Sequence, residues 1–263
     1  MVFDLMGFRD DWMREGKAKD TNTVIEPMHL VLVEEPEAHL HIQVQQVFIR
    51  QAYKVLTNHK FLKQNLNFTT QLVISTHSSH IAIETTFGNL RYFKRLPEGT
   101  ECAVATSKVI NLSDVFGDSD QTNKFVTRYL QSTHCDLFFA DAAILVEGVA
   151  ESMLLPHFIR SKFPELYQRY ITILGVNGRH AHRLSPLIEK LCLPTLVITD
   201  LDPAEKEGYH KSVVPKRGEG QISGNYAIAK WLMKEKDIDK LVDYSEDKKE
   251  FSFASPYRFS IRL

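Results

Sequence analysis

The sequence has few cysteines, no long hydrophobic run and almost no net charge. Its three cysteines, Cys102, Cys135 and Cys192, are odd in number and lack Cys-x-x-Cys spacing, so neither a disulfide framework nor a zinc cage is indicated. No stretch approaches the roughly 18 apolar residues of a membrane-spanning helix. Charged residues interrupt Met1–Asp20, which therefore does not resemble a signal peptide. We expect a soluble, cytoplasmic protein in a reducing compartment, with no membrane partner.

The formal net charge of −1 argues against a basic nucleic-acid-binding tail and against an acidic solvating tail. Apolar residues make up 43% and charged residues 25% of the chain, which is an ordinary globular composition. Because domains usually contain about 100–200 residues, a chain of 263 residues forms one large domain or two modest ones. Composition alone favours a neutral enzyme with a small-molecule substrate.

Two stretches share the layout of parallel α/β units, in which an apolar strand ends in carboxylates and a helix follows. In the first, residues 29–33 run into Glu34 and Glu35, and helical apolar spacing extends from Leu40 to Leu56. In the second, residues 142–146 end at Glu147, and a helix is expected over 150–162, which Pro156 should kink or limit in its first part. Further strands are expected at 71–74, 90–95, 101–110, 170–174, 195–199 and 251–263, and further helices at 118–131, 186–192 and 225–236. The predicted class is α/β, with one domain over 1–133 and a second, with a mostly parallel sheet, over 134–263.

Four carboxylates stand at strand ends or in the first turn of a helix in the second half: Glu147, Glu151, Asp200 and Asp202. Parallel sheets place their ligand sites at this edge. Converging acids repel one another unless cations lie between them, and hard oxygen ligands select Mg²⁺ or Mn²⁺. One or two such ions would activate water for phosphodiester hydrolysis. The alternative is that these are surface acids that cap helices and loops.

The segments I-L-V-E-G at Ile144–Gly148 and L-V-I-T-D-L-D at Leu196–Asp202 resemble the Toprim domain of topoisomerases, primases and related nucleases. The likeness covers residues 138–202. It implies that Glu147 ligates metal and acts as general acid or base, and that Asp200 and Asp202 are the D-x-D metal ligands. Glu151 would be a further ligand or would support one.

The segment L-V-L-V-E-E-P-E at Leu30–Glu37 resembles the Walker B strand of ABC-type ATPases. That resemblance places Glu34 near Mg²⁺ and Glu35 beside the attacking water. His77, in S-T-H-S-S-H at Ser75–His80, resembles the switch histidine that contacts the γ-phosphate. Two other interpretations remain open, a helix N-terminus for the glutamates and an ordinary loop position for the histidine.

An ABC-type ATPase followed by a Toprim domain is the layout of the OLD (overcoming lysogenization defect) family of ATP-dependent endonucleases. The likeness extends to G-Q-I-S-G-N-Y-A-I-A-K-W at Gly220–Trp231, which resembles the class that includes the nuclease subunit of Gabija antiphage systems. The resemblance implies DNA as substrate, ATP in the full-length protein and a homodimer or higher oligomer formed through the ATPase domain. It also implies a role in defence against phage, and a helicase-like partner if the chain is of the Gabija class.

The chain departs from that family pattern in several ways. It contains no G-x-x-x-x-G-K-[ST] phosphate loop, so we expect a fragment that does not hydrolyse ATP alone. We expect further acidic groups and a lysine beyond Leu263. Lys216 and Arg217 are weak candidates for contacts with DNA phosphates.

Two functions of different classes follow. The first is a metal-dependent DNA endonuclease that uses Glu147, Glu151, Asp200 and Asp202. The second is an ATP-gated DNA-binding sensor or scaffold whose Toprim domain does not cut. Topoisomerase or primase activity is disfavoured, because no strand-passage module surrounds the tyrosines and a primase does not explain the ATPase half.

Overall fold

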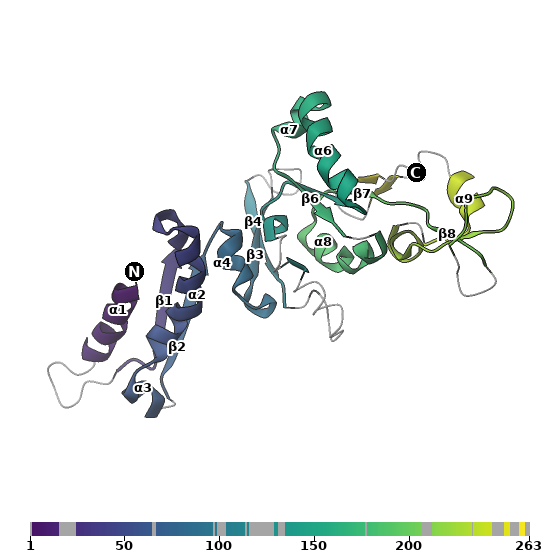
Figure 1. The fold of residues 1–263 in the computed structure, drawn as a ribbon. Helices are drawn as coiled ribbons and strands as arrows, with labels where there is room; N and C mark the ends of the chain where they lie inside the picture. The colour runs from purple at the N-terminus through teal and green to yellow at the C-terminus, as the bar shows by residue number, and fades with distance from the viewer. Residues whose placement is uncertain are drawn as a thin grey trace. The chain divides into compact units, whose positions relative to one another are not determined.

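The computed structural model describes residues 2–15, 25–64, 67–96, 98, 104–113, 115, 129–130, 135–176, 178–206, 212–232, 234–243, 250–252 and 258–260. The chain divides into two compact units, residues 1–86 and 87–263 (Figure 1). Both contain parallel strands joined through helices, so the predicted α/β class is confirmed. The antiparallel strands near residue 100 belong to the second unit, and the domain boundary near Thr133 stays a prediction.

The first unit is built around two parallel strands, β1 (Met28–Glu34) and β2 (Thr69–Ser75). Its helices are α1 (Val2–Glu15), the 3-10 helix η1 (Pro36–His39), α2 (Ile42–Thr57), α3 (Lys60–Gln64) and α4 (Ser79–Ile83). A core formed by Leu5, Val31, Phe48, Ala52 and Leu56 joins α1, β1 and α2. On β1, His29 and Val31 are buried while Leu30 and Leu32 are exposed. The strand at 71–74, expected to be buried, alternates between exposed and half-buried residues, because only one face of this sheet is covered by described residues.

His29 on β1 is buried against α1, where its ring stacks on Trp12 with centroids 4.5 Å apart and planes at 11°. Its Nδ1 atom is buried and has no hydrogen-bond partner among the described residues. Removal from water disfavours the imidazolium, and burial therefore lowers the pKa of His29 from its ordinary value of 6.5. The native first unit therefore keeps this histidine neutral.

We expect the first unit to lose stability as the pH falls through about 6.5, the unfolded-state value of histidine. The unfolded chain binds a proton there that the native chain resists, so stability is fully present above this pH. The measurement is the thermal unfolding midpoint at a pH about one unit above and about one unit below this value. His29→Phe, which keeps an aromatic ring but cannot be protonated, should flatten the dependence, whereas His41→Phe at an exposed position should not. An unchanged slope in His29→Phe would contradict this assignment.

The second unit contains a three-stranded parallel sheet in the order β6-β5-β7. Its strands are β5 (Ala142–Val146), β6 (Ile171–Gly175) and β7 (Thr195–Ile198), close to the expected positions. Figure 1 shows α6 (Val149–Lys162) and α8 (Ser185–Leu191) on opposite sides of this sheet. The short helix α7 (Pro164–Tyr167) follows α6, and two 3-10 helices, η4 (Cys135–Phe138) and η5 (Gly178–Arg183), precede β5 and α8. Helix α6 continues through Pro156, so this proline does not limit it to its first part.

An antiparallel hairpin of β3 (Arg91–Leu96) and β4 (Thr106–Asn111) precedes that sheet and follows the 3-10 helix η2 (Phe87–Asn89). Lys94 joins the hairpin to the end of α8, because its ammonium group donates to the carbonyls of Leu191 and Cys192, at 2.8 and 2.6 Å. A cation is favourable there because the last carbonyls of a helix carry partial negative charge. Most of the helix expected over 118–131 lies outside the described residues.

The last part of the chain corrects two expectations. The helix expected over 225–236 is instead a six-residue π-helix, η6 (Ala227–Leu232), followed by a separate helix α9 (Ile238–Asp243). The chain turns between them with Lys234 at a φ of 53°, and the Ser223 amide then donates to the Lys236 carbonyl. The strand expected over 251–263 is a short hairpin of β10 (Glu250–Ser252) and β11 (Arg258–Ser260). Another short antiparallel pair joins β8 (Pro203–Ala204) to β9 (Ile222–Ser223).

Within the described part of the chain, no helix has the combination of length and apolarity that crossing a membrane requires.

Candidate functional site

The predicted acids of the second unit lie at the carboxyl edge of the sheet β6-β5-β7. Strands β5 and β7 are parallel neighbours, with Val146 opposite Ile198. The residues that follow them, Glu147 after β5 and Thr199 and Asp200 after β7, therefore emerge side by side at one edge. Sequence order alone separates these acids by more than fifty positions, and the sheet register brings them together.

Glu147 is tied directly to the segment that follows β7. Its Oε2 atom accepts a hydrogen bond from the Thr199 hydroxyl at 2.9 Å and another from the Asp200 amide at 3.0 Å. These two donors hold one oxygen of the Glu147 side chain in place at the end of β7. The Oε1 atom and the exposed Asp200 carboxylate have no hydrogen-bond or ion-pair partner among the described residues. The structure thus places Glu147 and Asp200 together, as expected.

The other two acids are held differently. Glu151, in the first turn of α6, uses its Oε2 atom to accept the Gly148 amide at 3.0 Å, and so caps its own helix. A Cβ atom on Gly148 would lie 2.7 Å from this oxygen, so a side chain there would displace the Glu151 carboxylate. Asp202 has a φ of 46°, in the left-handed region, although Pro203 follows. The carboxylate of Glu151 therefore faces its own N-cap, and its predicted role at the metal stays a prediction.

The chemistry of this edge fits a hard divalent cation. No three carboxylate, histidine or cysteine side chains among the described residues converge on one point. Mg²⁺, however, is commonly bound through one or two carboxylates and keeps several waters. Glu147 and Asp200 provide two carboxylates, and no described lysine or arginine forms an ion pair with either. These two residues would hold the ion, and Asp202 follows two positions after Asp200 in the chain.

The predicted ATPase residues of the first unit also meet at a parallel sheet edge. Glu34 pairs with Ser75 at the ends of β1 and β2, and the Glu35 amide donates to the Ser75 carbonyl at 3.0 Å. Glu35 has a φ of 41°, and its Oε1 atom lies 3.1 Å from Nε2 of His77. Both side chains are largely exposed, so this contact adds little stability. Glu35 and His77 are brought together, while Glu34 extends into solvent at the end of β1.

Glu37 is a residue of this edge that sequence reasoning did not single out. Its Oε1 atom accepts the Thr76 hydroxyl at 2.8 Å and the His77 amide at 2.6 Å, so it fixes the backbone of the switch-like histidine. Gln45 on α2 supports the same loop, because its Oε1 accepts the Ser78 hydroxyl at 2.7 Å. Its place as the third glutamate of E-E-P-E could have identified it, because a carboxylate just past the end of one strand faces the loop after the neighbouring strand.

The candidate DNA-binding cations each have an acidic neighbour. The Lys216 ammonium lies 3.3 Å from Glu219, and the Arg217 guanidinium pairs with Asp243 on α9. Buried Gln221 holds the loop in shape by accepting the Lys216 amide at 2.9 Å. The loop therefore offers DNA less positive charge than its two cations suggest, and its contact with phosphates stays a prediction.

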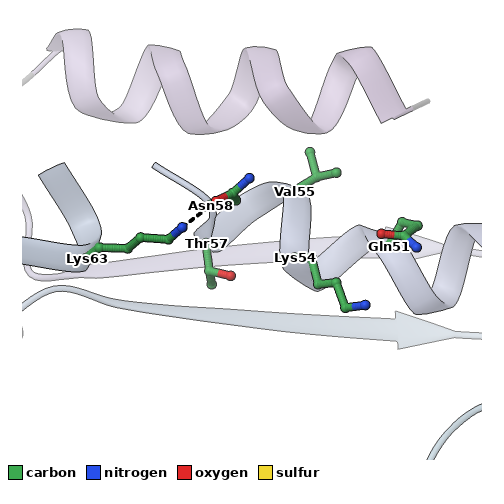
Figure 2. A pocket seen from close by; sticks show the side chains of 6 residues that line it. All are labelled: Gln51, Lys54, Val55, Thr57, Asn58 and Lys63. Atoms are coloured by element: carbon green, nitrogen blue, oxygen red, sulfur yellow. Dashed lines mark hydrogen bonds between the residues drawn. The ribbon is translucent and has the colours of Figure 1, made fainter. Parts of the chain in front are cut away.

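The first unit has a surface hollow beside α2 and α3 (Figure 2). It is lined by residues of the last turns of α2, the following loop and α3: Gln51, Lys54, Val55, Thr57, Asn58 and Lys63. The Lys63 ammonium donates to the Asn58 side chain at 2.6 Å across it. Glu35 and His77 lie near the other end of α2, so this hollow is not the nucleotide site that the sequence predicts.

Comparison with protein families gives two matches within the chain. Residues 138–202 match the TOPRIM domain of the overcoming lysogenization defect protein-like family. Residues 11–82 match the AAA ATPase domain family. The first match contains Glu147, Asp200 and Asp202, and the second contains Glu34, Glu35 and His77. The resemblance inferred from the motifs is confirmed at the level of these two domains.

Two curated relatives match most of the chain. It is 31% identical over 242 residues to Endonuclease GajA of Bacillus cereus (strain HuB5-5), covering 86% of this chain and 33% of that protein. It is 24% identical over 218 residues to Endonuclease GajA of Bacillus cereus (strain VD045), covering 83% of this chain and 33% of that protein. The chain thus spans about a third of the length of these relatives.

Proposed function

We propose that this chain, which matches an AAA ATPase domain over residues 11–82 and an OLD-like TOPRIM domain over residues 138–202, is the metal-binding part of a DNA endonuclease of the OLD family. The observation that carries this proposal is the contact of Glu147 with the Asp200 segment at the carboxyl edge of the parallel sheet. The two matched relatives are named as endonucleases, which supports the same class of reaction.

The residues of this edge have different proposed roles in phosphodiester hydrolysis. A bound Mg²⁺ or Mn²⁺ would lower the pKa of a water ligand and stabilise charge on the leaving oxygen. Asp200 and Glu147 would hold the cation, and Asp202 would complete the D-x-D pair. Glu147 would also be placed to take or give a proton at the scissile bond, because the Thr199 hydroxyl and the Asp200 amide hold its side chain at this edge. Glu151 supports the start of α6 and, if its side chain turns, adds a fourth carboxylate.

The ATPase residues are proposed to regulate access to this site in the intact protein. Glu34 would approach the nucleotide's Mg²⁺, Glu35 would orient the attacking water, and His77 would contact the γ-phosphate. Because nucleotide sites of this type form between two ATPase domains, we propose a homodimer or higher oligomer. Phage or other foreign DNA is the proposed target, with Lys216 and Arg217 as weak phosphate contacts and a helicase-like protein as a Gabija-type partner.

Plasmid cleavage by the intact protein tests this function. We expect nicking or linearisation with Mg²⁺ or Mn²⁺, its loss on chelation by EDTA and its return when excess metal is added. Asp200→Asn should lower the rate by about a hundredfold, because it removes the charge of a metal ligand while keeping its shape. Cleavage that persists in EDTA, or in Asp200→Asn at the wild-type rate, would contradict the proposal. DNA binding without cleavage under every condition would favour the scaffold function.

A further inference from the structure

A short turn formed by Ser223, Gly224 and Asn225 is hydrogen-bonded to the segment that carries the D-x-D acids. The Ser223 hydroxyl donates to the Leu201 carbonyl at 2.7 Å, and the Gly224 amide donates to the Asp202 carbonyl at 2.7 Å. The Asn225 side chain donates to the Asp200 carbonyl at 3.0 Å. Three consecutive carbonyls are therefore each held by one residue of this turn.

The close fit of this turn favours glycine at its centre. A Cβ atom on Gly224 would lie 3.1 Å from the Asp202 carbonyl oxygen, which is tighter than most contacts of this kind, so this carbonyl would have to shift. The backbone of Asp202 is also in the left-handed region, with a φ of 46°. Such a conformation persists when surrounding contacts over-determine it. The turn supplies those contacts.

Asn225 is also connected to Glu147 by hydrogen bonds through Thr199. Its Nδ2 atom lies 2.6 Å from the Thr199 hydroxyl oxygen, which in turn donates to Oε2 of Glu147. Asn225 is fully buried, with none of its surface exposed, so these contacts form away from bulk water. Hydrogen bonds strengthen in such surroundings.

The direction of this chain of hydrogen bonds follows from the donor and acceptor inventory. Oδ1 of Asn225 faces the amides of Ala227 and Ile228, at 2.9 and 3.4 Å, so its amino group must face Thr199. A threonine hydroxyl has a single hydrogen. Because Thr199 accepts from Asn225, that hydrogen points at Glu147. The orientation of the Asn225 amide thus determines that Thr199 donates its hydrogen bond to Glu147.

We propose that Asn225 is a positioning residue for the metal site, acting through Thr199 on Glu147 and directly on the Asp200 backbone. This proposal rests on the proposed function, since it concerns the same carboxylates. It predicts that Glu147 and Asp200 are held in place before the metal arrives. The entropy cost of ordering these two residues is then incurred when the chain folds and not when the metal binds. This favours tight metal binding.

The two ends of the Asn225 side chain allow this role to be separated from helix capping. Asn225→Asp keeps an oxygen that accepts the Ala227 and Ile228 amides, so the start of η6 stays capped. It replaces the amino group by an oxygen that repels the Asp200 carbonyl and draws the Thr199 hydrogen away from Glu147. Thr199→Val removes the hydroxyl at nearly constant volume, and Thr199→Ser restores it.

The matched control is Asn89→Asp. It makes the same chemical change at an exposed residue of η2 for which the structure records no side-chain hydrogen bond among the described residues. Wild type, Asn225→Asp, Thr199→Val, Thr199→Ser and Asn89→Asp would be compared as the full 263-residue chain. The readouts are Mn²⁺ affinity from the spectrum of free Mn²⁺ in electron paramagnetic resonance, and metal-free hydrogen exchange over residues 199–202.

We expect Asn225→Asp and Thr199→Val each to weaken Mn²⁺ binding about tenfold and to speed exchange at the Asp200 amide by a similar factor. Thr199→Ser and Asn89→Asp should behave as wild type. Wild-type affinity and wild-type exchange in both Asn225→Asp and Thr199→Val would overturn the positioning role. If wild type bound no Mn²⁺, the proposed function would fail. Exchange at Asp200 would still decide whether Asn225 and Thr199 hold this segment.

Discussion

Glutamine in place of Glu147 is expected to slow plasmid cleavage by the intact protein on the order of a hundredfold or more. The amide has the size of the carboxylate, and its carbonyl oxygen can still accept the Thr199 hydroxyl and the Asp200 amide. The substitution therefore preserves the local fold and removes only the negative charge and the basic oxygen. Both losses act on the metal and on proton transfer rather than on stability.

The matched control for this substitution is Glu165→Gln, at an exposed acid in the first turn of α7. It makes the same change of charge away from the sheet edge and should cleave at the wild-type rate. Initial rates of plasmid nicking at saturating Mn²⁺, together with the unfolding midpoints of both variants, provide the comparison. Cleavage by Glu147→Gln at the rate of Glu165→Gln would show that Glu147 has no part in the reaction.

Truncation of Leu145 to alanine is expected to lower the free energy of unfolding of the second unit by about 3 kcal/mol. Leu145 lies at the centre of β5, the middle strand of the parallel sheet, and none of its surface is exposed. It is flanked by Leu174 on β6 and Val197 on β7, both buried. The lost side chain leaves a cavity on one face of the sheet, and the hydrogen-bonded strands cannot move to fill it without losing their pairing.

Leu154→Ala is the control, because Leu154 on α6 is 51% exposed and should cost well under about 1 kcal/mol. The chain has two tryptophans, Trp12 in the first unit and Trp231 in the second. Urea unfolding followed by fluorescence in a Trp12→Phe background therefore reports on the second unit alone. Equal unfolding free energies for Leu145→Ala and Leu154→Ala would contradict the assignment of β5 as the core strand.

The strands and their carboxylate ends could be predicted because short-range pattern determines them. An apolar run such as 142–146 indicates a strand, and the rule that parallel strands end at one edge then brings Glu147 to Asp200. The resemblance to the Walker B strand and switch histidine assigned Glu35 and His77 to one site, and the structure places their side chains in contact. The family resemblance supplied the order of the two domains, which composition alone did not indicate.

Contacts made by side chains across distant loops could not be predicted in this way. Nothing in the sequence spacing of Asn225 links it to Thr199 or Glu147, although the structure connects all three. Glu151 was assigned to the metal although its position three residues after Gly148 matches the capping pattern that the structure shows. The helix expected over 225–236 ends early because the chain must return to pair with β9, which is a tertiary requirement.

Binding of Mn²⁺ by the 263-residue chain tests the central claim most directly, since it requires neither ATP nor DNA. Titration followed by electron paramagnetic resonance should show Mn²⁺ bound by wild type. Binding should be lost or strongly weakened in Glu147→Gln and in Asp200→Asn, and retained in Glu165→Gln. Equal Mn²⁺ affinity in all four proteins, or no binding by wild type, would contradict a metal site at the carboxyl edge of β5 and β7.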